Sequence, residues 1–186
     1  MRKIIVVFFV LCVSACSALP LMSFDVADYK DVPPICLNVE SFFVESEVMQ
    51  YDRLPHIEYK MPVTPEQALK NWAKNRFSAV NTDSLLKAIL VIKEASMIRR
   101  RKPSGNWYTF DNMEYTLSFQ VELVFLTKDD QVQYRLSVGG HEMKSIPRKS
   151  APVTKERVWL EMMNAMINKV NDKLVHDLPA TYQLIP

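Results

Sequence analysis

Residues 113–125 read MEYTLSFQVELVF, in which apolar and polar side chains alternate as far as Leu123. A period of two places the apolar side chains on one face of a β-strand and the polar ones on the other. The turn residues Lys128-Asp129-Asp130 follow, and residues 132–138 alternate again, which predicts the returning strand of a hairpin. We therefore expect an antiparallel sheet with one buried and one wet face.

Further strands are predicted on the N-terminal side of this hairpin. Residues 85–98 are apolar on both alternating sets, which indicates a central strand that is at least partly covered on both faces. Residues 99–111 predict a loop from that strand to the hairpin. Residues 35–44 also alternate and predict one more strand.

Two amphipathic helices complete the predicted fold. At residues 64–67, Thr64 can cap a helix, Pro65 suits its first position, and Gln67 completes a capping box. The apolar stripe of this helix continues to Val80. Thr154 is predicted to cap a long last helix. The order β-α-β-β-β-α predicts an α+β two-layer sandwich, with an antiparallel or mixed four-stranded sheet and both helices on one face.

The N-terminus has the pattern of a secretory signal. Arg2 and Lys3 precede an apolar run at residues 4–12, and small residues follow it. The sequence Val13-Ser14-Ala15-Cys16 resembles the lipobox of bacterial lipoproteins, which implies that Cys16 carries lipid, including palmitate, in the mature protein. Two alternatives are a retained anchor, although a membrane span takes about 20 apolar residues, and a cut after Ala18 that releases a soluble periplasmic protein.

This resemblance also implies a location and a domain plan. Ser17 follows the cysteine, and by the usual sorting rule that indicates the outer membrane, with the protein facing the periplasm. We expect a signal peptide at residues 1–15, a lipidated tether at residues 16–34, a single α+β periplasmic domain at residues 35–178 and a C-terminal tail at residues 179–186.

Composition excludes several functional classes. The chain has 23 basic and 21 acidic side chains, and loss of Arg2 and Lys3 with the signal leaves the numbers equal, which argues against nucleic-acid binding. With Cys16 lipidated, Cys36 has no partner for an intramolecular disulfide. Only three glycines occur, too few for a phosphate-cradling Gly-rich loop.

No motif indicates an enzyme, a metal or a cofactor. The histidines His56, His141 and His176 have no metal-ligand spacing, and no Gly-x-Ser-x-Gly sequence occurs. The alternative of an enzyme acting on envelope material would need an unrecognised polar pocket that gathers Glu94 with His56 or His141.

The strongest local charge feature is Arg99-Arg100-Arg101-Lys102, followed by Trp107. We predict these five residues as candidate contacts to a membrane or a partner; the alternative is a solvated loop with Trp107 tucked onto the sheet. Met162, Met163 and Met166 could form an adaptable binding surface, but core packing explains them more simply.

Several short motifs resemble uncharacterised lipoproteins of alphaproteobacteria. The resemblance covers about residues 54–178, and it implies no activity, because none is known for that family. The architecture is also distantly similar to the outer-membrane lipoprotein that plugs the lipopolysaccharide-inserting barrel and to the auxiliary lipoprotein of ABC-type lipid transporters. The motifs are Pro55-His56-Ile57-Glu58, Pro62, Pro65, Ala68, Trp72-Ala73, Arg76, Ile92 to Met97, Lys155 to Trp159, and Met162.

The expected function is a non-enzymatic role in envelope assembly or transport, through binding of a protein or lipid partner. A lipid anchor, a sheet domain and the lack of catalytic motifs support this expectation. Two alternatives stay open: an envelope-acting enzyme with an unrecognised site, and a purely structural lipoprotein.

Overall fold

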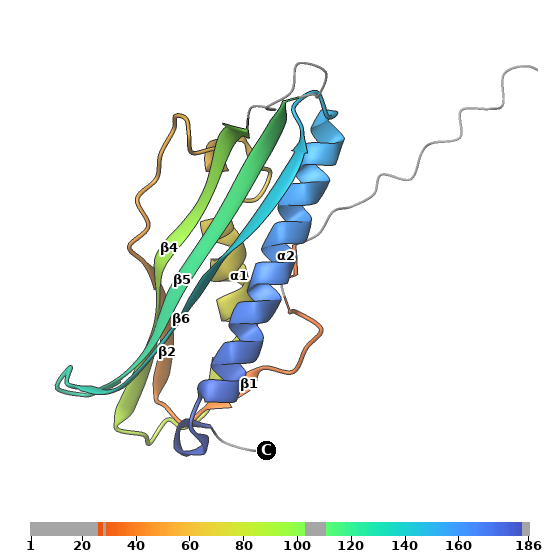
Figure 1. Ribbon diagram of the computed structural model, residues 1–186. Coiled ribbons are helices and arrows are strands. Elements are labelled where there is room, and N and C mark those ends of the chain that lie inside the picture. Colours follow the sequence, from red (N-terminus) through yellow and green to blue (C-terminus); the bar gives the residue numbers. More distant parts are fainter. Residues whose placement is uncertain (1–25, 28, 103–110, 184–186) are drawn as a thin grey trace, which may run out of the picture.

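The computed structural model describes residues 26–27, 29–102 and 111–183. The alternating stretch forms β5 (Asn112–Thr127), which pairs in antiparallel fashion with β4 (Leu86–Lys102) and β6 (Val132–Pro147). β2 (Ser41–Ser46) joins the other edge of β4 in parallel, so a mixed sheet has the order β2-β4-β5-β6 (Figure 1). β1 (Ile35–Leu37) and β3 (Phe77–Ala79) form a small parallel sheet of their own.

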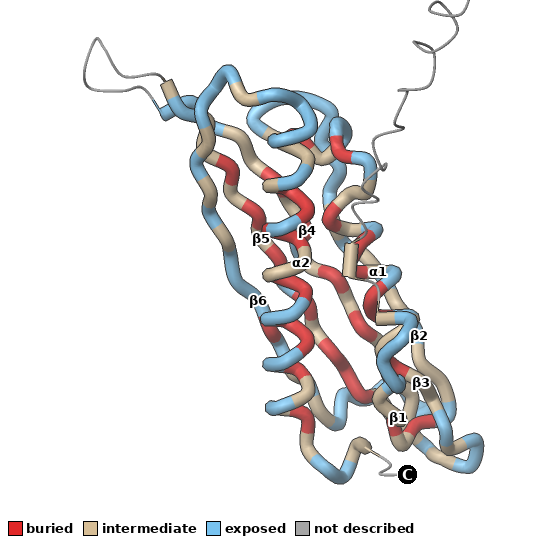
Figure 2. The backbone as a smooth tube through the Cα atoms, turned by 90° about the vertical axis from the view of Figure 1, so that its right-hand side faces the viewer, coloured by how far each residue is buried: buried red, intermediate tan, exposed pale blue. Residues whose placement is uncertain are grey.

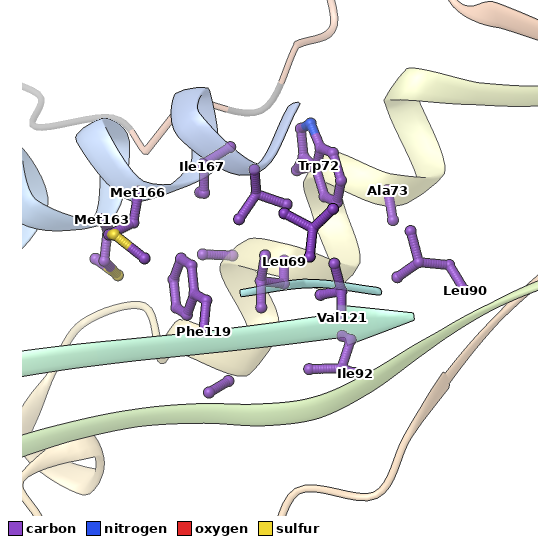
Figure 3. Packing of buried hydrophobic residues seen from close by; sticks show 14 of the residues in the cluster. Leu69, Trp72, Ala73, Leu90, Ile92, Phe119, Val121, Met163, Met166 and Ile167 are labelled. Atoms are coloured by element: carbon purple, nitrogen blue, oxygen red, sulfur yellow. The ribbon is translucent and has the colours of Figure 1, made fainter. Parts of the chain in front are cut away.

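Both helices, α1 (Pro65–Arg76) and α2 (Pro152–Asp177), cover the same face of the large sheet (Figure 2). The odd-numbered residues of β5 from Tyr115 to Phe125 point towards them and are at most 1% exposed. Figure 3 shows Met163 and Met166 of α2 packed above Phe119, and Trp72 of α1 above Val121. The predicted α+β sandwich with both helices on one face is confirmed.

Thr64 and Pro65 start α1 as predicted, whereas the Gln67 side chain does not close the predicted capping box and the helix ends earlier than predicted. Thr64 Oγ1 accepts a hydrogen bond from the Gln67 N–H (3.2 Å), and Pro65 takes the first helical position. The Gln67 side chain donates to Asn71 (2.8 Å). The helix stops at Arg76, because Phe77 is extended (φ −120°, ψ 140°) and begins β3. The predicted continuation of the helix to Val80 is therefore wrong.

The predicted cap of the last helix is also wrong. α2 begins at Pro152, and no described side chain caps it. Thr154 lies inside the first turn, where its N–H bonds to the Ala151 carbonyl (3.1 Å). Proline has a fixed φ that suits the first helical position, and this starts the helix before Thr154.

β4 differs from its prediction in two ways. A bulge between Ile92 and Glu94 shifts the register, so that Ile92 and Ala95 are both buried on the helix face. Residues 99–102, predicted as a loop, continue the strand because β5 begins early enough to pair with them, with Arg99 opposite Tyr115. The predicted strand at residues 35–44 is likewise divided, into β1 and β2.

Segments beside both termini contact the sandwich. The Ala27 N–H donates to Asn164 Oδ1 (2.8 Å) and the Tyr29 hydroxyl to Asn168 Oδ1 (2.7 Å), both on α2. The Asn38 N–H donates to the Tyr182 carbonyl (3.0 Å). The predicted domain boundaries stay predictions, and residues 1–15 and Cys16 lie outside the described residues.

Candidate functional site

One end of the molecule gathers positive charge. β4 ends, β5 begins, β6 ends and α2 begins there (Figure 1). Basic side chains at this end outnumber carboxylates among the described residues. We call this region the basic end; it comprises Lys60, Arg99, Arg100, Arg101, Lys102, Arg148, Lys149, Lys155 and Arg157, with the carboxylates Glu58, Asp111, Glu114 and Glu156.

Two of the residues predicted as contacts are engaged in ion pairs that join β4 to the start of β5. Arg101 Nε donates to Asp111 Oδ2 over 2.9 Å, and Lys102 Nζ lies 3.6 Å from Glu114 Oε2. Arg100 is exposed. Trp107 lies outside the described residues, so its predicted contact stays a prediction.

Arg99 lines a pocket of about 190 Å³ at the basic end. Its side chain lies on the helix face of β4, because the bulge at Ile92 places Ala95, Met97 and Arg99 on that face. Side chains from a short 3-10 helix (Glu58–Lys60), from β5 and from the first turns of α2 complete the walls. We call it the basic pocket; its polar and aromatic lining is Lys60, Arg99, Tyr115, Lys155, Glu156 and Trp159.

The basic pocket has a surplus of positive charge. Among the described residues, no carboxylate forms an ion pair with Lys60, Arg99 or Lys155, although Glu156 also lines the pocket. The first turn of α2 lies at the same place, and the positive end of the helix dipole adds to this surplus. The pocket is therefore electrostatically suited to an anion.

Two aromatic residues form the buried side of this pocket. Trp159 is 8% exposed, and its buried Nε1 has no hydrogen-bond partner among the described residues. Such an unpaired N–H costs about 1–3 kcal/mol. The Tyr115 ring lies edge-on to Trp159, with centroids 5.8 Å apart. Burial raises the pKa of Tyr115 above its ordinary value despite the opposing effect of Arg99, which keeps the phenol protonated at neutral pH.

A hydrogen-bonded segment holds Lys60 near Arg99. The Ile57 N–H donates to the Met97 carbonyl (3.0 Å), and the Met97 N–H donates to Glu58 Oε1 (2.7 Å). His56 Nδ1 lies 3.1 Å from the same Glu58 oxygen. These bonds tie residues 55–58 to the edge of β4, and we interpret the His56–Glu58 pair as structural support for the pocket wall.

The residues predicted for an enzymatic pocket are not gathered. Glu94 is exposed on β4, where Ser96 Oγ donates to it (3.1 Å). His141 is exposed on β6, opposite Ser118, and His56 is engaged with Glu58. Within the described ranges, no group of three or more His, Cys, Asp or Glu side chains could hold a metal ion.

The methionines and one tryptophan of the helices belong to the core. Met162, Met163 and Met166 are at most 2% exposed, and Trp72 is fully buried. They pack on the sheet (Figure 3), so the simpler prediction for these methionines is confirmed. No helix in the described part of the chain is long and apolar enough to span a membrane.

A larger hollow of about 890 Å³ lies between residues 26–32 and the two helices. Its lining is mainly apolar, with Lys30 and Asp31 side by side. Because these charges are opposite, the hollow has no charge surplus, and we regard the basic pocket as the better candidate site.

No family model and no curated protein matches this chain. Among solved structures, a homolog of neuraminyllactose-binding hemagglutinin from Helicobacter pylori is similar, with 12% identity, coverage of 84% of this chain and 93% of that one, and a TM-score of 0.49. A minor lipoprotein from Acinetobacter baumannii has 12% identity, 81% and 99% coverage, and a TM-score of 0.39. The rare lipoprotein B of Shewanella oneidensis has 14% identity, 73% and 94% coverage, and a TM-score of 0.37. Because all three TM-scores are below 0.5, we infer no function from these likenesses.

Proposed function

We propose that this protein is a lipoprotein anchored at Cys16 in the outer membrane, facing the periplasm, and that it acts by binding rather than by catalysis. The observation that carries the binding role is the basic pocket, where Lys60, Arg99 and Lys155 converge without a carboxylate partner among the described residues. Like charges held close together repel one another, and an anionic partner relieves that repulsion. The role in the envelope is assembly or transport.

Anchoring and charge would act together. Each buried methylene of an acyl chain contributes about 0.8 kcal/mol, so more than one chain makes the attachment stable. Near an anionic surface each Lys or Arg adds about 1 kcal/mol. A lipidated protein with a basic end is thus suited to contact anionic groups in its own membrane.

The anchor is tested on the full chain. We expect intact mass spectrometry of the membrane-extracted protein to show a chain that starts at Cys16 and carries acyl groups. Cys16→Ala should carry no acyl groups, because the residue that bears them is lost. An unlipidated wild-type protein, or acyl groups on the Cys16→Ala protein, would contradict the proposal.

The binding role is tested by cross-linking in intact cells. We expect the triple variant Lys60→Ala, Arg99→Ala, Lys155→Ala to lose a cross-linked envelope component that the wild type retains. The control Lys128→Ala, Lys173→Ala removes cations outside the basic end and should retain it. Loss in both variants would show that the basic end is not the binding surface, and no component in any sample would favour a purely structural lipoprotein.

A further inference from the structure

We infer that the basic pocket binds a phosphomonoester group, of the kind found on a lipid headgroup or as free phosphate. This inference rests on the proposed binding role of the basic end and names the chemical class of its ligand. It is argued from the charges, the hydrogen-bond donors and the size of the pocket.

Charge favours a phosphomonoester over a singly charged anion. The pocket holds the cations Lys60, Arg99 and Lys155 and the carboxylate Glu156, which leaves a surplus of two positive charges. A phosphomonoester carries about −1.5 to −2 at pH 7. A carboxylate or a phosphodiester carries only one negative charge and would leave the surplus half compensated.

The available donors match the oxygens of a phosphate. An Arg guanidinium can bond two oxygens of such a group side by side, and lysine ammonium groups add point charges. Trp159 and Tyr115 form the buried wall beside these cations, so that the Trp159 signal can report on an occupant. The positive end of the α2 dipole lies at this pocket and favours an anion as well.

The volume indicates a headgroup rather than a whole molecule. Pockets for drug-sized ligands measure about 300–1,000 Å³, whereas this one measures about 190 Å³. One phosphate with its nearest atoms is a suitable occupant, and acyl chains would stay outside.

The test follows the indole N–H signal of Trp159 by NMR. The full chain, with its anchor, is labelled with ¹⁵N-tryptophan and kept in maltoside micelles, and Trp159→Phe assigns the signal. The probes are inorganic phosphate, short-chain phosphatidic acid (a phosphomonoester) and short-chain phosphatidylglycerol (a phosphodiester). We expect a saturable shift with phosphatidic acid that phosphatidylglycerol does not match.

Two adjacent arginines provide a matched control. Arg99 and Arg100 carry the same charge and lie on the same strand, but their side chains point to opposite faces of β4. We expect Arg99→Ala, and separately Lys155→Ala, to weaken the apparent affinity about tenfold or more, whereas Arg100→Ala leaves it unchanged. An unaltered Trp72 signal confirms that each variant is folded.

The three probes distinguish a lipid headgroup from a soluble phosphate as the ligand. A shift with phosphatidic acid alone assigns the pocket to a lipid headgroup, and an equal shift with inorganic phosphate assigns it to a soluble phosphate; both support the inference. No saturable shift with either probe, an equal response to phosphatidylglycerol, or an equal loss in Arg99→Ala and Arg100→Ala overturns it. Because the Cys16 and cross-linking tests use no phosphate probe, failure here is distinguishable from failure of the proposed function.

Discussion

Two neighbouring glycines of β6 have different surroundings. A Cβ on Gly139 would lie 2.9 Å from the Phe119 carbonyl oxygen, a backbone atom of the adjacent strand. A Cβ on Gly140 would have Met166 Cε, the end of a flexible side chain, as its nearest neighbour at 3.6 Å. The close approach of β5 and β6 therefore requires glycine at position 139, whereas position 140 has room for a small side chain.

We predict that Gly139→Ala lowers the free energy of unfolding by about 1–3 kcal/mol, because the backbone must shift to admit the methyl group. Gly140→Ala should be neutral or stabilising by up to about 1 kcal/mol, since alanine restricts the unfolded chain. Urea unfolding followed by circular dichroism measures both. Equal effects of the two substitutions would show that the contact with Phe119 is unimportant.

At the scale of single residues, the sequence predicted part of the site. Arg99 was a candidate because it belongs to a visible charge run. Lys60 and Lys155 were missed, because single lysines on distant segments have no pattern that marks them. The side to which Arg99 points depends on the bulge after Ile92, and the signal for it is the change of the apolar set from even to odd numbers between Ile92 and Ala95.

At the scale of elements, the two helix starts can be compared directly. Thr64 caps α1 through a hydrogen bond from the Gln67 N–H, whereas Thr154 lies within the first turn of α2 and no described side chain caps that helix. A capping threonine satisfies a backbone N–H that has no partner inside the helix. Thr154 is exposed and has no such role in this structure.

We predict that Thr64→Ala destabilises the protein by about 1 kcal/mol, the usual cost of losing a side-chain cap. Thr154→Ala is the matched control and should change the stability by no more than about 0.5 kcal/mol. The midpoint of thermal unfolding reports the difference. A larger loss in Thr154→Ala than in Thr64→Ala would refute this assignment of the caps.

The elements that the sequence predicted well are long and strongly periodic. β5 and its hairpin with β6 follow from simple alternation. β1 and β3 are three residues each, too short for a periodic signal, and Phe77 continues the apolar spacing of α1 although its backbone is extended. The basic residues at the end of β4 suggested a loop, but pairing with β5 outweighs their low strand preference.

At the scale of the whole molecule, the C-terminal segment joins the two sheets. The Tyr182 ring stacks on Tyr134 of β6 (5.2 Å between centroids) and lies 4.2 Å from that of Phe125 of β5. Gln183 forms a bridge with Leu37 of β1. This segment therefore connects the large sheet to the small one.

We predict that Tyr182→Ala lowers the free energy of unfolding by about 2 kcal/mol, because each aromatic pair contributes about 0.5–1.5 kcal/mol beyond the buried area. Tyr182→Phe keeps the ring and should remain close to wild type. Urea unfolding of the full chain measures both variants. If the two variants were equally destabilised, the rings would not be the source of the stability.

The overall architecture was predictable because a sheet with one apolar and one solvent-exposed face and two amphipathic helices have few ways to bury their apolar faces. The parallel direction of β2 relative to β4 was not predictable, since apolar and polar residues alternate in the same way in parallel and antiparallel strands. It follows from α1, which connects β2 to the neighbouring part of the sheet and brings β4 back in the same direction.

The hydrogen bond between Ala27 and Asn164 limits how far the domain can lie from the membrane. If Cys16 carries the lipid, the chain takes eleven residue steps from Cys16 to Ala27, which attaches to α2. An extended chain of that length reaches at most about 40 Å. A loose tether up to residue 34 would allow about 65 Å. With that anchor, the attachment point on α2 would stay within about 40 Å of the bilayer, and a partner of the domain would have to enter the zone that the tethered domain can reach.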